Sequence, residues 1–440
     1  MNRFLLKATL VGALGGLLFG FDTAVIAGTT QQLTDVFHLT PYLLGWTVSI
    51  GLAGTVLGAL VAGTLGQRIG GRDALRVMAL LYCVSSLGCA FAWNWDVLMV
   101  SRFIGGIGIG GSSVLGPVYI AELAPAKWRG RMVGLFQFNI VVGIMLAYLS
   151  NYIITALKLG AAQWHWEFGV AILPSAGFLF LLYGVPRSSR WLVTTNQTLE
   201  AREVLELMGS PDASAELQEI VHSVHLERGT KEEPLFSGRY RKPIFLAITI
   251  GLFNQLSGVN AILYYANYIF ATAGYSSNSA ALQTVGMGCV NIFATLLGMS
   301  LIDKLGRKTL LLIGALGTAV ALAGVALIFH THQHTSWLLG MLILFMVFFA
   351  TSQGAVIWVY ISEVFPSRVR SKGQSVGSSA HWIMNAIIAG VFPAIAAVSR
   401  ALPFAFFAAM MVLQFVVVLF TYPETKGRSL ESIQADLHIA

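Results

Sequence analysis

Apolar stretches of about twenty residues follow one another along almost the whole of this chain. A stretch of this length, coiled as a helix, crosses a hydrocarbon core of about 30 Å. The chain is 56% hydrophobic and 11% charged, whereas a typical soluble domain carries about 25% charged residues. It therefore lacks the polar side chains that a water-exposed surface needs. The pattern predicts an all-α membrane protein and argues against a soluble two-domain enzyme.

The apolar pattern predicts twelve membrane-spanning helices. Their expected bounds are residues 5–28, 41–66, 74–93, 96–121, 129–153, 165–185, 241–271, 278–302, 308–330, 336–362, 369–398 and 401–422. The expected parts of the chain are an N-terminal six-helix half, a cytoplasmic helical linker, a C-terminal six-helix half and a cytoplasmic tail, at residues 1–187, 188–240, 241–422 and 423–440.

Basic residues predict the orientation of these spans. Arg3 and Lys7 precede the first span, and basic clusters follow the second, fourth, eighth and tenth, whereas the opposite loops hold only Lys158 and Arg400. The positive-inside rule then places both termini and the linker in the cytoplasm. The net charge of +7 reflects this bias, so a nucleic-acid partner is not needed to explain it. No small-residue cleavage site follows the first span, so we expect it to be retained.

A charged motif recurs half a chain apart. Residues 122–129 read Glu-Leu-Ala-Pro-Ala-Lys-Trp-Arg, and residues 363–370 read Glu-Val-Phe-Pro-Ser-Arg-Val-Arg. The glutamate, proline and arginine recur at one offset of 241 residues (363 − 122, 366 − 125 and 370 − 129). Similar pairs follow the second and eighth spans and the sixth and twelfth. Since six spans separate the copies, both halves have the same orientation, as in parallel-repeat transporters.

These motifs resemble those of the sugar-porter family of the major facilitator superfamily, over almost the entire chain. The most specific pieces are Arg102-Phe-Ile-Gly-Gly-Ile-Gly-Ile-Gly110, Pro117-Val-Tyr-Ile-Ala-Glu122 with Arg129-Gly130, Gln255-Leu-Ser-Gly-Val-Asn260 with Tyr264-Tyr265, Asp303 to Arg307, Trp358 with Glu363 and Arg370, and Pro423-Glu-Thr-Lys-Gly427. The pattern is closest to bacterial xylose or glucose proton symporters. The resemblance implies a major facilitator fold and a proton-coupled monosaccharide symporter of the bacterial cytoplasmic membrane. It would work by alternating access around a site near the midplane.

Two ionisable residues within spans are expected to couple the proton. Asp22 lies well inside the first span, and Arg102 lies near the start of the fourth. A charge at the bilayer centre costs about 2.5–3.5 kcal/mol on insertion scales, so each residue needs a reason to be there. The resemblance implies that they face one another, which would hold the carboxylate ionised. Protonation of Asp22 would then release Arg102. The alternative is a static ion pair that only orients two helices.

Sugar recognition requires groups that both donate and accept hydrogen bonds, which amides do without charge. The resemblance implies a sugar site formed by Gln137, Asn254, Gln255, Asn260, Tyr264, Asn291, Trp358, His381, Trp382, Asn385 and Phe19. Trp358 would present a flat face to the sugar ring, and Gly258 interrupts the seventh span, as in discontinuous helices near substrates. The alternative is that the amides bond only between helices. His381 is alternatively a neutral core histidine bonded to a helix carbonyl, or a group that titrates near neutral pH.

Charges at the cytoplasmic helix ends are expected to form a gate. They are Arg68, Arg72, Glu122, Arg129, Asp303, Arg307, Glu363 and Arg370. In the family, such charges latch the two halves when the inner gate is shut, and loss of the latch would favour the inward-open state. This chain departs from the family pattern at Gln67, where an acid is usual, and at Gly71, where a second arginine is usual. The alternative of solvated loops explains the arginines but not the repeated acids.

Three other patterns are not assigned any chemistry. Residues 106–111 satisfy the dinucleotide-binding pattern, but they lie within a span with no preceding strand, so we expect close helix packing. Histidines at 330, 332 and 334 alternate and do not share a helix face, so we expect an external polar loop. Cys83, Cys89 and Cys289 lack the spacing of a metal or disulfide site. We expect neither a metal nor a cofactor.

The nearest alternatives are a facilitative sugar uniporter and a cyclitol–proton symporter. A transporter-like sugar sensor would need a long regulatory tail, whereas residues 423–440 are short. An enzyme would need a nucleophile and a base placed together, and the sequence offers no such set. The expected partners are a monosaccharide, a proton and the lipid bilayer, and a second protein chain is not required. The sequence does not distinguish glucose, xylose, galactose and a cyclitol.

Overall fold

The computed structural model describes residues 3–125, 128–229, 234–366, 369–428, 432–433 and 437. The secondary structure of this part of the chain is helical throughout. Twelve of its helical segments are long and apolar enough to cross a membrane. The number of spans and the all-α fold predicted from the apolar pattern are therefore confirmed.

The first half of the chain forms six spans and a group of linker helices. In chain order its helices are α1 (Arg3–Phe37), α2 (Pro41–Ile69), α3 (Gly71–Ala90), α4 (Trp95–Leu123), α5 (Arg129–Ala156), η1 (Gly160–Ala162), α6 (Gln163–Gly169), α7 (Ile172–Leu181), η2 (Leu182–Gly184), α8 (Ser189–Thr194), α9 (Thr198–Met208) and α10 (Ala213–Gly229). Asn94 caps α4 by accepting a hydrogen bond from the Val97 N–H at 2.8 Å. Helix α1 continues to Phe37, well beyond the expected end at residue 28.

The second half repeats six spans with more interruptions. Its helices are η3 (Gly238–Tyr240), α11 (Arg241–Leu256), α12 (Val259–Tyr264), α13 (Ala266–Thr272), α14 (Ser277–Leu305), α15 (Arg307–Thr331), η4 (Thr335–Trp337), α16 (Leu338–Thr351), α17 (Gln353–Val364), α18 (Arg370–Val398) and α19 (Leu402–Thr421). The tenth span, expected to be continuous, is divided at Ser352, whose φ and ψ are −120° and −87°. Apolar periodicity alone does not predict this break.

The seventh span is broken at Gly258, as the sequence predicts. Helix α11 ends at Leu256, Gly258 has φ +79°, and α12 begins at Val259. This left-handed conformation favours glycine, because a Cβ atom would be strained there. A Cβ atom at Gly258 would also meet the ring of Phe407 on α19. The break leaves Asn260 just beyond the end of α11.

We expect Gly258→Ala to lower the free energy of unfolding by about 2–4 kcal/mol, through left-handed strain and overpacking. Gly286→Ala is the matched control, because Gly286 lies inside α14 and a Cβ atom there would meet nothing within 4 Å. The control should be neutral or slightly stabilising. Thermal unfolding in detergent measures both effects. Equal stability of the two variants would contradict the assigned role of Gly258.

Packing divides the chain into two compact units. The first comprises Met1–Val25, Ile50–Ile154 and Lys158–Lys231. The second comprises Ile26–Ser49, Thr155–Leu157 and Glu232–Ala440. Residues 26–49 therefore group with the second unit, although they are near in sequence to the rest of the first.

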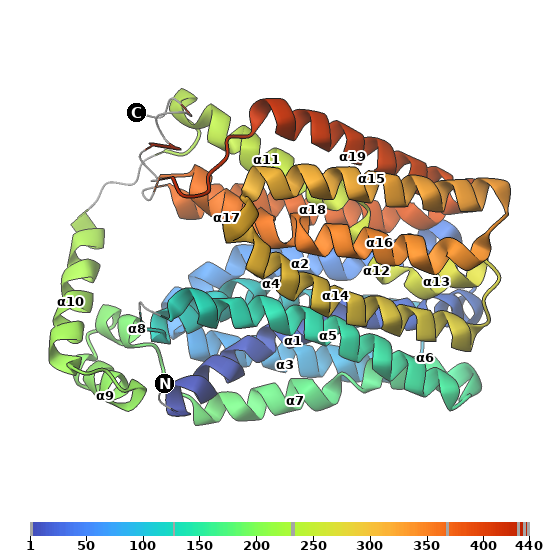
Figure 1. The fold of residues 1–440 in the computed structure, drawn as a ribbon. Helices are drawn as coiled ribbons and strands as arrows, with labels where there is room; N and C mark the ends of the chain where they lie inside the picture. Colours follow the sequence, from blue (N-terminus) through green and yellow to red (C-terminus); the bar gives the residue numbers. More distant parts are fainter. Residues whose placement is uncertain are drawn as a thin grey trace. The chain divides into compact units, whose positions relative to one another are not determined.

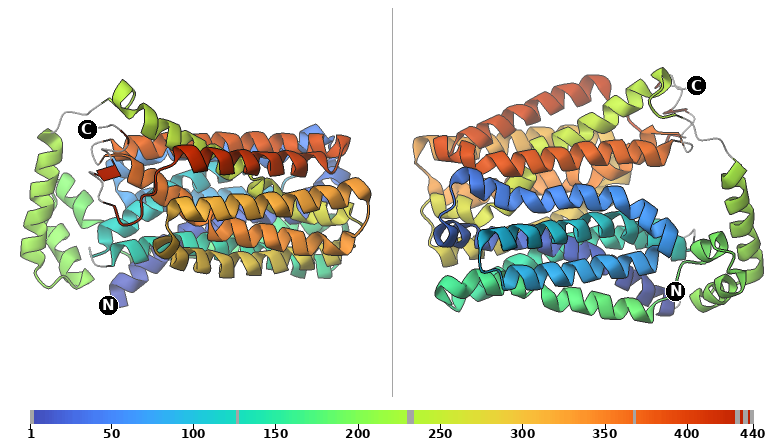
Figure 2. Two further views of the ribbon diagram at one scale, coloured as in Figure 1. Left: turned by 45° about the horizontal axis from the view of Figure 1, so that its top comes forward. Right: turned by 180° about the vertical axis from the view of Figure 1, so that it is seen from behind.

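The linker helices pack against the first unit. Leu192, Val204 and Val224 belong to the same buried cluster as Leu75 of α3 and Tyr119 of α4. Helix α9 ends at Met208, and Gly209 takes the left-handed conformation there. Within this unit, α8, α9 and α10 lie at the same end as the N-terminus (Figures 1 and 2).

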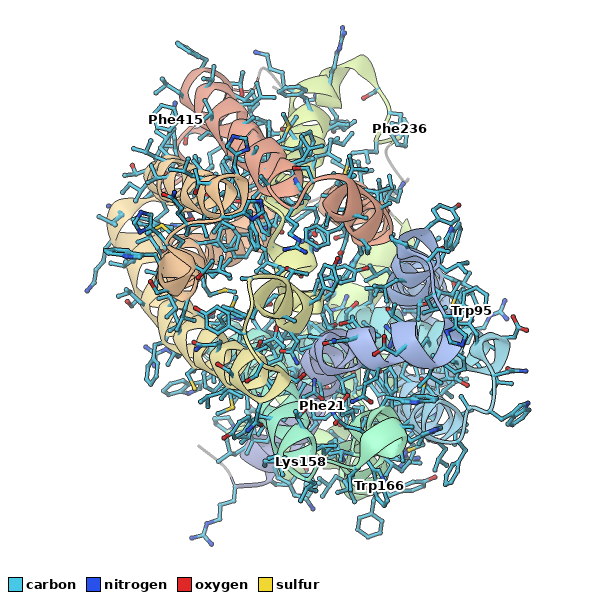
Figure 3. The ribbon with its side chains drawn as sticks, turned by 90° about the vertical axis from the view of Figure 1, so that its right-hand side faces the viewer. Phe21, Trp95, Lys158, Trp166, Phe236 and Phe415 are labelled. Atoms are coloured by element: carbon cyan, nitrogen blue, oxygen red, sulfur yellow. The ribbon has the colours of Figure 1, made fainter. Side chains whose placement is uncertain are left out.

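Aromatic residues mark the other end of the first unit. Trp93 and Trp166 are 79% and 60% exposed, and Figure 3 shows Trp166 pointing away from the helices of its unit. His165 and the carbonyl oxygen of Ala90 are 2.8 Å apart, which joins the start of α6 to the end of α3. Exposed tryptophans of this kind are typical of a membrane–water interface.

The glycine-rich segment of the fourth span lies against α2. A Cβ atom on Gly106 would meet the carbonyl oxygen of Gly51, and one on Gly110 would meet that of Thr55. Small residues at these positions let the two backbones approach closely. This is the helix packing that the sequence analysis expects of residues 106–111.

In the second unit, α15 and α19 lie side by side (Figure 1). Phe329 at the end of α15 stacks on Phe404 of α19, with ring centroids 5.5 Å apart. Helix α11 approaches α18 closely, because a Cβ atom on Gly251 would lie 2.6 Å from the carbonyl oxygen of Gly377. The Gly251 contact holds α11 against α18, and these two helices carry three of the six predicted amide residues.

Candidate functional site

Asp22 and Arg102 come together within the first unit. The carboxylate Oδ1 of Asp22 lies 3.8 Å from where a Cβ atom on Gly105 would be, and Gly105 is nearly one turn after Arg102 on α4. The guanidinium attracts the carboxylate electrostatically. Arg102 is only 7% exposed, and its guanidinium carbon lies 5.5 Å from the centre of the Phe168 ring. The two residues predicted to couple the proton are therefore neighbours within the first unit.

A second buried carboxylate was missed by the sequence analysis. Glu167 of α6 is completely buried, and the side-chain amide of Gln163 donates to its Oε1 at 2.8 Å. Glu167 precedes the Phe168 that covers Arg102. A charged residue within an otherwise apolar span was the signal that could have identified it.

The second unit brings four predicted polar residues into one hydrogen-bonded network. The amide of Asn260 donates to Oε1 of Gln255 at 3.0 Å, and the Nε2 of Gln255 donates to Oδ1 of Asn254 at 3.2 Å. The same Nε2 lies 3.1 Å from Nε2 of His381. Residues 254 and 255 belong to α11, Asn260 to α12 and His381 to α18. The break at Gly258 lets Asn260 reach back to Gln255.

This geometry makes His381 a hydrogen-bond acceptor. The oxygen of Gln255 is occupied by the amide of Asn260, so its nitrogen faces His381 and donates. A protonated imidazole carries only donors, so His381 is neutral here. Its partner is an amide rather than the helix carbonyl of one sequence-based alternative. The other ring nitrogen, Nδ1, lies 3.3 Å from the same amide nitrogen.

Aromatic residues adjoin this network. The Trp358 ring centroid lies 5.2 Å from that of His381, and the Trp382 centroid lies 5.0 Å from it. One turn further along α18, the amide of Asn385 donates to the hydroxyl of Tyr264 at 3.0 Å. Amides, an imidazole and indole faces thus lie together, a combination suited to a ligand with many hydroxyl groups.

No hydrogen bond among the described residues joins three other predicted sugar residues, Asn291, Gln137 and Phe19, to this network. Oδ1 of Asn291 lies 3.5 Å from the Thr295 hydroxyl one turn along the same helix, a long hydrogen bond at best. Gln137 of α5 is half-buried, and Phe19 packs against the hydrophobic core of the first unit. Their part in a sugar site remains a prediction.

The predicted cytoplasmic charges of the second unit form a compact cluster. Arg307 donates to both carboxylate oxygens of Glu363, at 2.8 and 3.1 Å, and to Asp303 at 3.0 Å. The hydroxyl of Thr425 donates to Glu363 at 2.6 Å. A bidentate arginine–carboxylate ion pair of this kind is among the stronger side-chain interactions. The cluster ties α15, α17 and the segment after α19 to one another.

Glu424 caps the start of α15, a role the sequence analysis did not assign. Its carboxylate accepts from the main-chain N–H groups of Arg307 at 2.8 Å and Lys308 at 3.0 Å. Burial raises the pKa of Glu424, but hydrogen bonds from the main-chain N–H of Lys426 and from the start of α15 lower it by more, so the pKa lies below its ordinary value of 4.5. The negative charge also complements the positive end of the helix dipole.

Glu424→Gln is expected to lower the free energy of unfolding by about 1 kcal/mol at neutral pH, through the weakened cap. A carboxylate whose folded pKa is lowered contributes stability above its unfolded pKa, and that contribution is lost as the pH falls through the folded value. The difference between wild type and variant should therefore shrink below about pH 4. Thermal unfolding in detergent across pH measures it. Glu219→Gln, exposed on α10, is the control, and a pH-independent difference would contradict the cap.

The first unit builds a corresponding charge cluster around Asp73, which was not predicted. Asp73 lies in the first turn of α3 and accepts from Arg72 at 3.0 Å, Arg76 at 2.7 Å and Arg187 at 3.1 Å. Arg187 stands where the second half has Glu424. The first half therefore has the carboxylate on helix α3 and the arginine after the sixth span, whereas the second half has the arginine on α15 and the carboxylate after α19. An acid in the first turn of a helix was the available sequence signal.

The remaining predicted gate residues are placed as follows. Glu122 hydrogen-bonds with the Ser188 side chain and is attracted electrostatically to Arg190. Arg68 is exposed at the end of α2, and Arg370 is half-buried at the start of α18. The side chain of Arg129 lies outside the described part of the structure. Whether these charges act as a gate stays a prediction.

Known proteins resemble this chain over nearly its whole length. The family model described as "Sugar (and other) transporter" matches residues 8–437. The D-xylose-proton symporter of Escherichia coli strain K12 is 35% identical over 472 residues, covering 99% of this chain and 96% of that protein. The solved inward-open conformation of the xylose transporter XylE from E. coli is 34% identical with a TM-score of 0.88, covering 98% of this chain and 99% of that one. The structure of XylE, described as a major facilitator superfamily proton:xylose symporter bound to 6-bromo-6-deoxy-D-glucose, is 35% identical with a TM-score of 0.80, covering 99% of each chain.

Proposed function

This chain belongs to the sugar (and other) transporter family and has the major facilitator fold, and we propose that it carries a monosaccharide across the membrane together with a proton. Its twelve apolar helical segments make it a multi-pass membrane protein. The relatives that support the proposal are a D-xylose-proton symporter and a symporter structure that holds a hexose analogue. The substrate class proposed for this chain is therefore a pentose or hexose.

The observation that carries the sugar assignment is the amide network around Gln255. Asn254, Gln255 and His381 are each less than 10% exposed. Together with Asn260 they form one hydrogen-bonded network that joins three helices, α11, α12 and α18. Burying several polar groups in a membrane protein is costly without a ligand or function. Neutral amides match hydroxyl groups, which both donate and accept, with no buried charge to compensate.

The proton assignment rests on Asp22 beside Arg102. In its ionised form Asp22 is held by the guanidinium, and protonation removes that attraction. An energetic difference between the protonated and ionised states lets a proton bias a conformational equilibrium. Alternating access then follows if the two states open the sugar site to opposite sides of the membrane.

The proposed topology follows from the basic residues. The linker helices and the N-terminus share one end of the first unit (Figure 2), which is also the end that carries Arg72 and Arg187. The positive-inside rule assigns that end to the cytoplasm. By likeness to its bacterial relatives, the proposed location is a bacterial cytoplasmic membrane.

Uptake into proteoliposomes tests this function. Labelled D-xylose, D-glucose and D-galactose are presented from an acidic outside medium, with and without a protonophore. The proposal predicts that at least one sugar accumulates above its equilibrium level and that the protonophore abolishes the excess. Equilibration without accumulation would indicate a facilitative uniporter instead. Absence of uptake for all three sugars and for a cyclitol would contradict sugar transport.

A further inference from the structure

The unpredicted break in the tenth span places a buried glutamine next to the amide network. Helix α16 ends at Thr351 and α17 begins at Gln353. Gln353 is only 1% exposed. Its main-chain oxygen accepts from the amide of Asn254 at 3.4 Å. Asn254 in turn accepts from Gln255, so the network extends from α18 through α11 to the start of α17.

The side chain of Gln353 is poorly satisfied where it lies. Its Nε2 donates to the sulfur of Met411 on α19 at 3.2 Å, and a thioether is a weak acceptor. Its Oε1 is buried, and no donor to it exists among the described residues. A buried acceptor without a donor destabilises the fold. A residue kept only for packing would be better replaced by an apolar side chain.

Asn385, close to the network on α18, has the same deficit. Asn385 uses its Nδ2 to reach Tyr264, and its Oδ1 is buried without a donor among the residues that the structure describes. Asn385 lies one turn beyond His381 on α18. Two amides near the network, Gln353 and Asn385, therefore each have a buried carbonyl oxygen with no donor among the described residues. Hydroxyl groups of a sugar are donors, and they would supply what both amides lack.

We propose that Gln353 is a further sugar-recognition residue, whose side-chain oxygen accepts a hydrogen bond from one hydroxyl of the bound monosaccharide. This rests on the proposed function. A turn of the side chain toward a ligand would break its weak hydrogen bond to Met411 but not the link to Asn254, which uses the main-chain oxygen. The irregular backbone at Ser352 sets this residue apart from a regular helical position. Gln353 would thus contribute to which sugar is accepted.

Removal of the amide with little change in shape tests the proposal. We expect Gln353→Met to raise the Kd of the best-bound sugar about tenfold, the value of one lost hydrogen bond to a ligand. Its thermal stability should stay equal or rise, since an unsatisfied polar group is removed. Gln353→Leu serves as a second variant should the first fail to fold. Gln414→Met is the matched control. Gln414 is also 1% exposed, and its Oε1 has no donor among the described residues. No hydrogen bond among those residues joins Gln414 to the network.

A series of deoxy sugars identifies the hydroxyl. Removing the hydroxyl that Gln353 recognises should weaken binding to wild type about tenfold and to Gln353→Met less than twofold. The control should show the wild-type pattern. If wild type binds sugar and Gln353→Met has the same Kd and the same deoxy pattern, the oxygen serves only an ordered water and the inference is wrong. If wild type binds none of the sugars, the proposed function itself fails, and this inference fails with it.

Discussion

Asp22→Asn is expected to abolish sugar accumulation driven by a pH gradient while sugar counterflow continues. Asparagine has nearly the shape of aspartate but cannot exchange a proton, so the carrier should cycle without a driving force. One pH unit is worth about 1.4 kcal/mol, which can support about tenfold accumulation. In the variant the accumulation ratio should fall to one. Labelled-sugar uptake and counterflow in the same proteoliposomes measure both quantities.

Asp35→Asn provides the matched control for this prediction. Asp35 lies on the same helix, α1, but is exposed, whereas the Asp22 carboxylate lies against α4 beside Arg102. The control should accumulate sugar like wild type. Accumulation that survives in Asp22→Asn would contradict the coupling assignment. Loss of counterflow as well would instead assign Asp22 to sugar binding or to the helix packing around Arg102.

Gln255→Leu is expected to weaken sugar binding about 30- to 200-fold. Gln255 bonds to three of the other polar residues of the network, so its loss leaves Asn254, Asn260 and His381 each short of a partner. Each lost or misplaced hydrogen bond in a buried site is worth about 1 kcal/mol or more. Two or three such losses correspond to about 30- to 200-fold in Kd. Equilibrium binding to purified protein measures the effect.

The control for Gln255→Leu is Gln414→Leu. Both residues are 1% exposed, but Gln414 belongs to α19 and is not among the hydrogen-bonded residues of the network. It should keep the wild-type Kd. If Gln255→Leu folds and binds sugar with an unchanged Kd, the network only joins helices. This is the alternative stated for the amides in the sequence analysis.

The fold was largely predictable because hydropathy over twenty residues directly reflects the bilayer. The twelve spans and the interruption at Gly258 follow from composition and from one glycine. The break at Ser352 did not follow from hydropathy, because the short polar run Thr351-Ser352-Gln353 lies inside a span that is apolar overall. It depends on packing: a Cβ atom on Gly314 of α15 would meet the Ser352 side chain. Such contacts between distant segments leave no periodic signal.

The candidate site divides in the same way. Gln255, Asn260 and His381 could be named in advance because polar residues in apolar spans are conspicuous and the family resemblance orders them. Glu424 could not be assigned its cap, because its partner Arg307 is 117 residues away in sequence. Asp73 was missed for a related reason. Its partner Arg187 is 114 residues away in sequence. Only the folded first unit shows that its helix carries the acid and its following segment the base, whereas the second unit has the base on the helix and the acid, Glu424, on the segment.

The central claim is that sugar and proton move together, and a pH electrode tests it most directly. A sugar that the carrier accepts is added to weakly buffered, de-energised vesicles that contain the protein, and outside pH and labelled-sugar entry are followed together. The account predicts that the outside medium becomes more alkaline in proportion to the sugar that enters, and that Asp22→Asn vesicles take up sugar without this change. Sugar entry through the wild-type protein with no change in outside pH would contradict it.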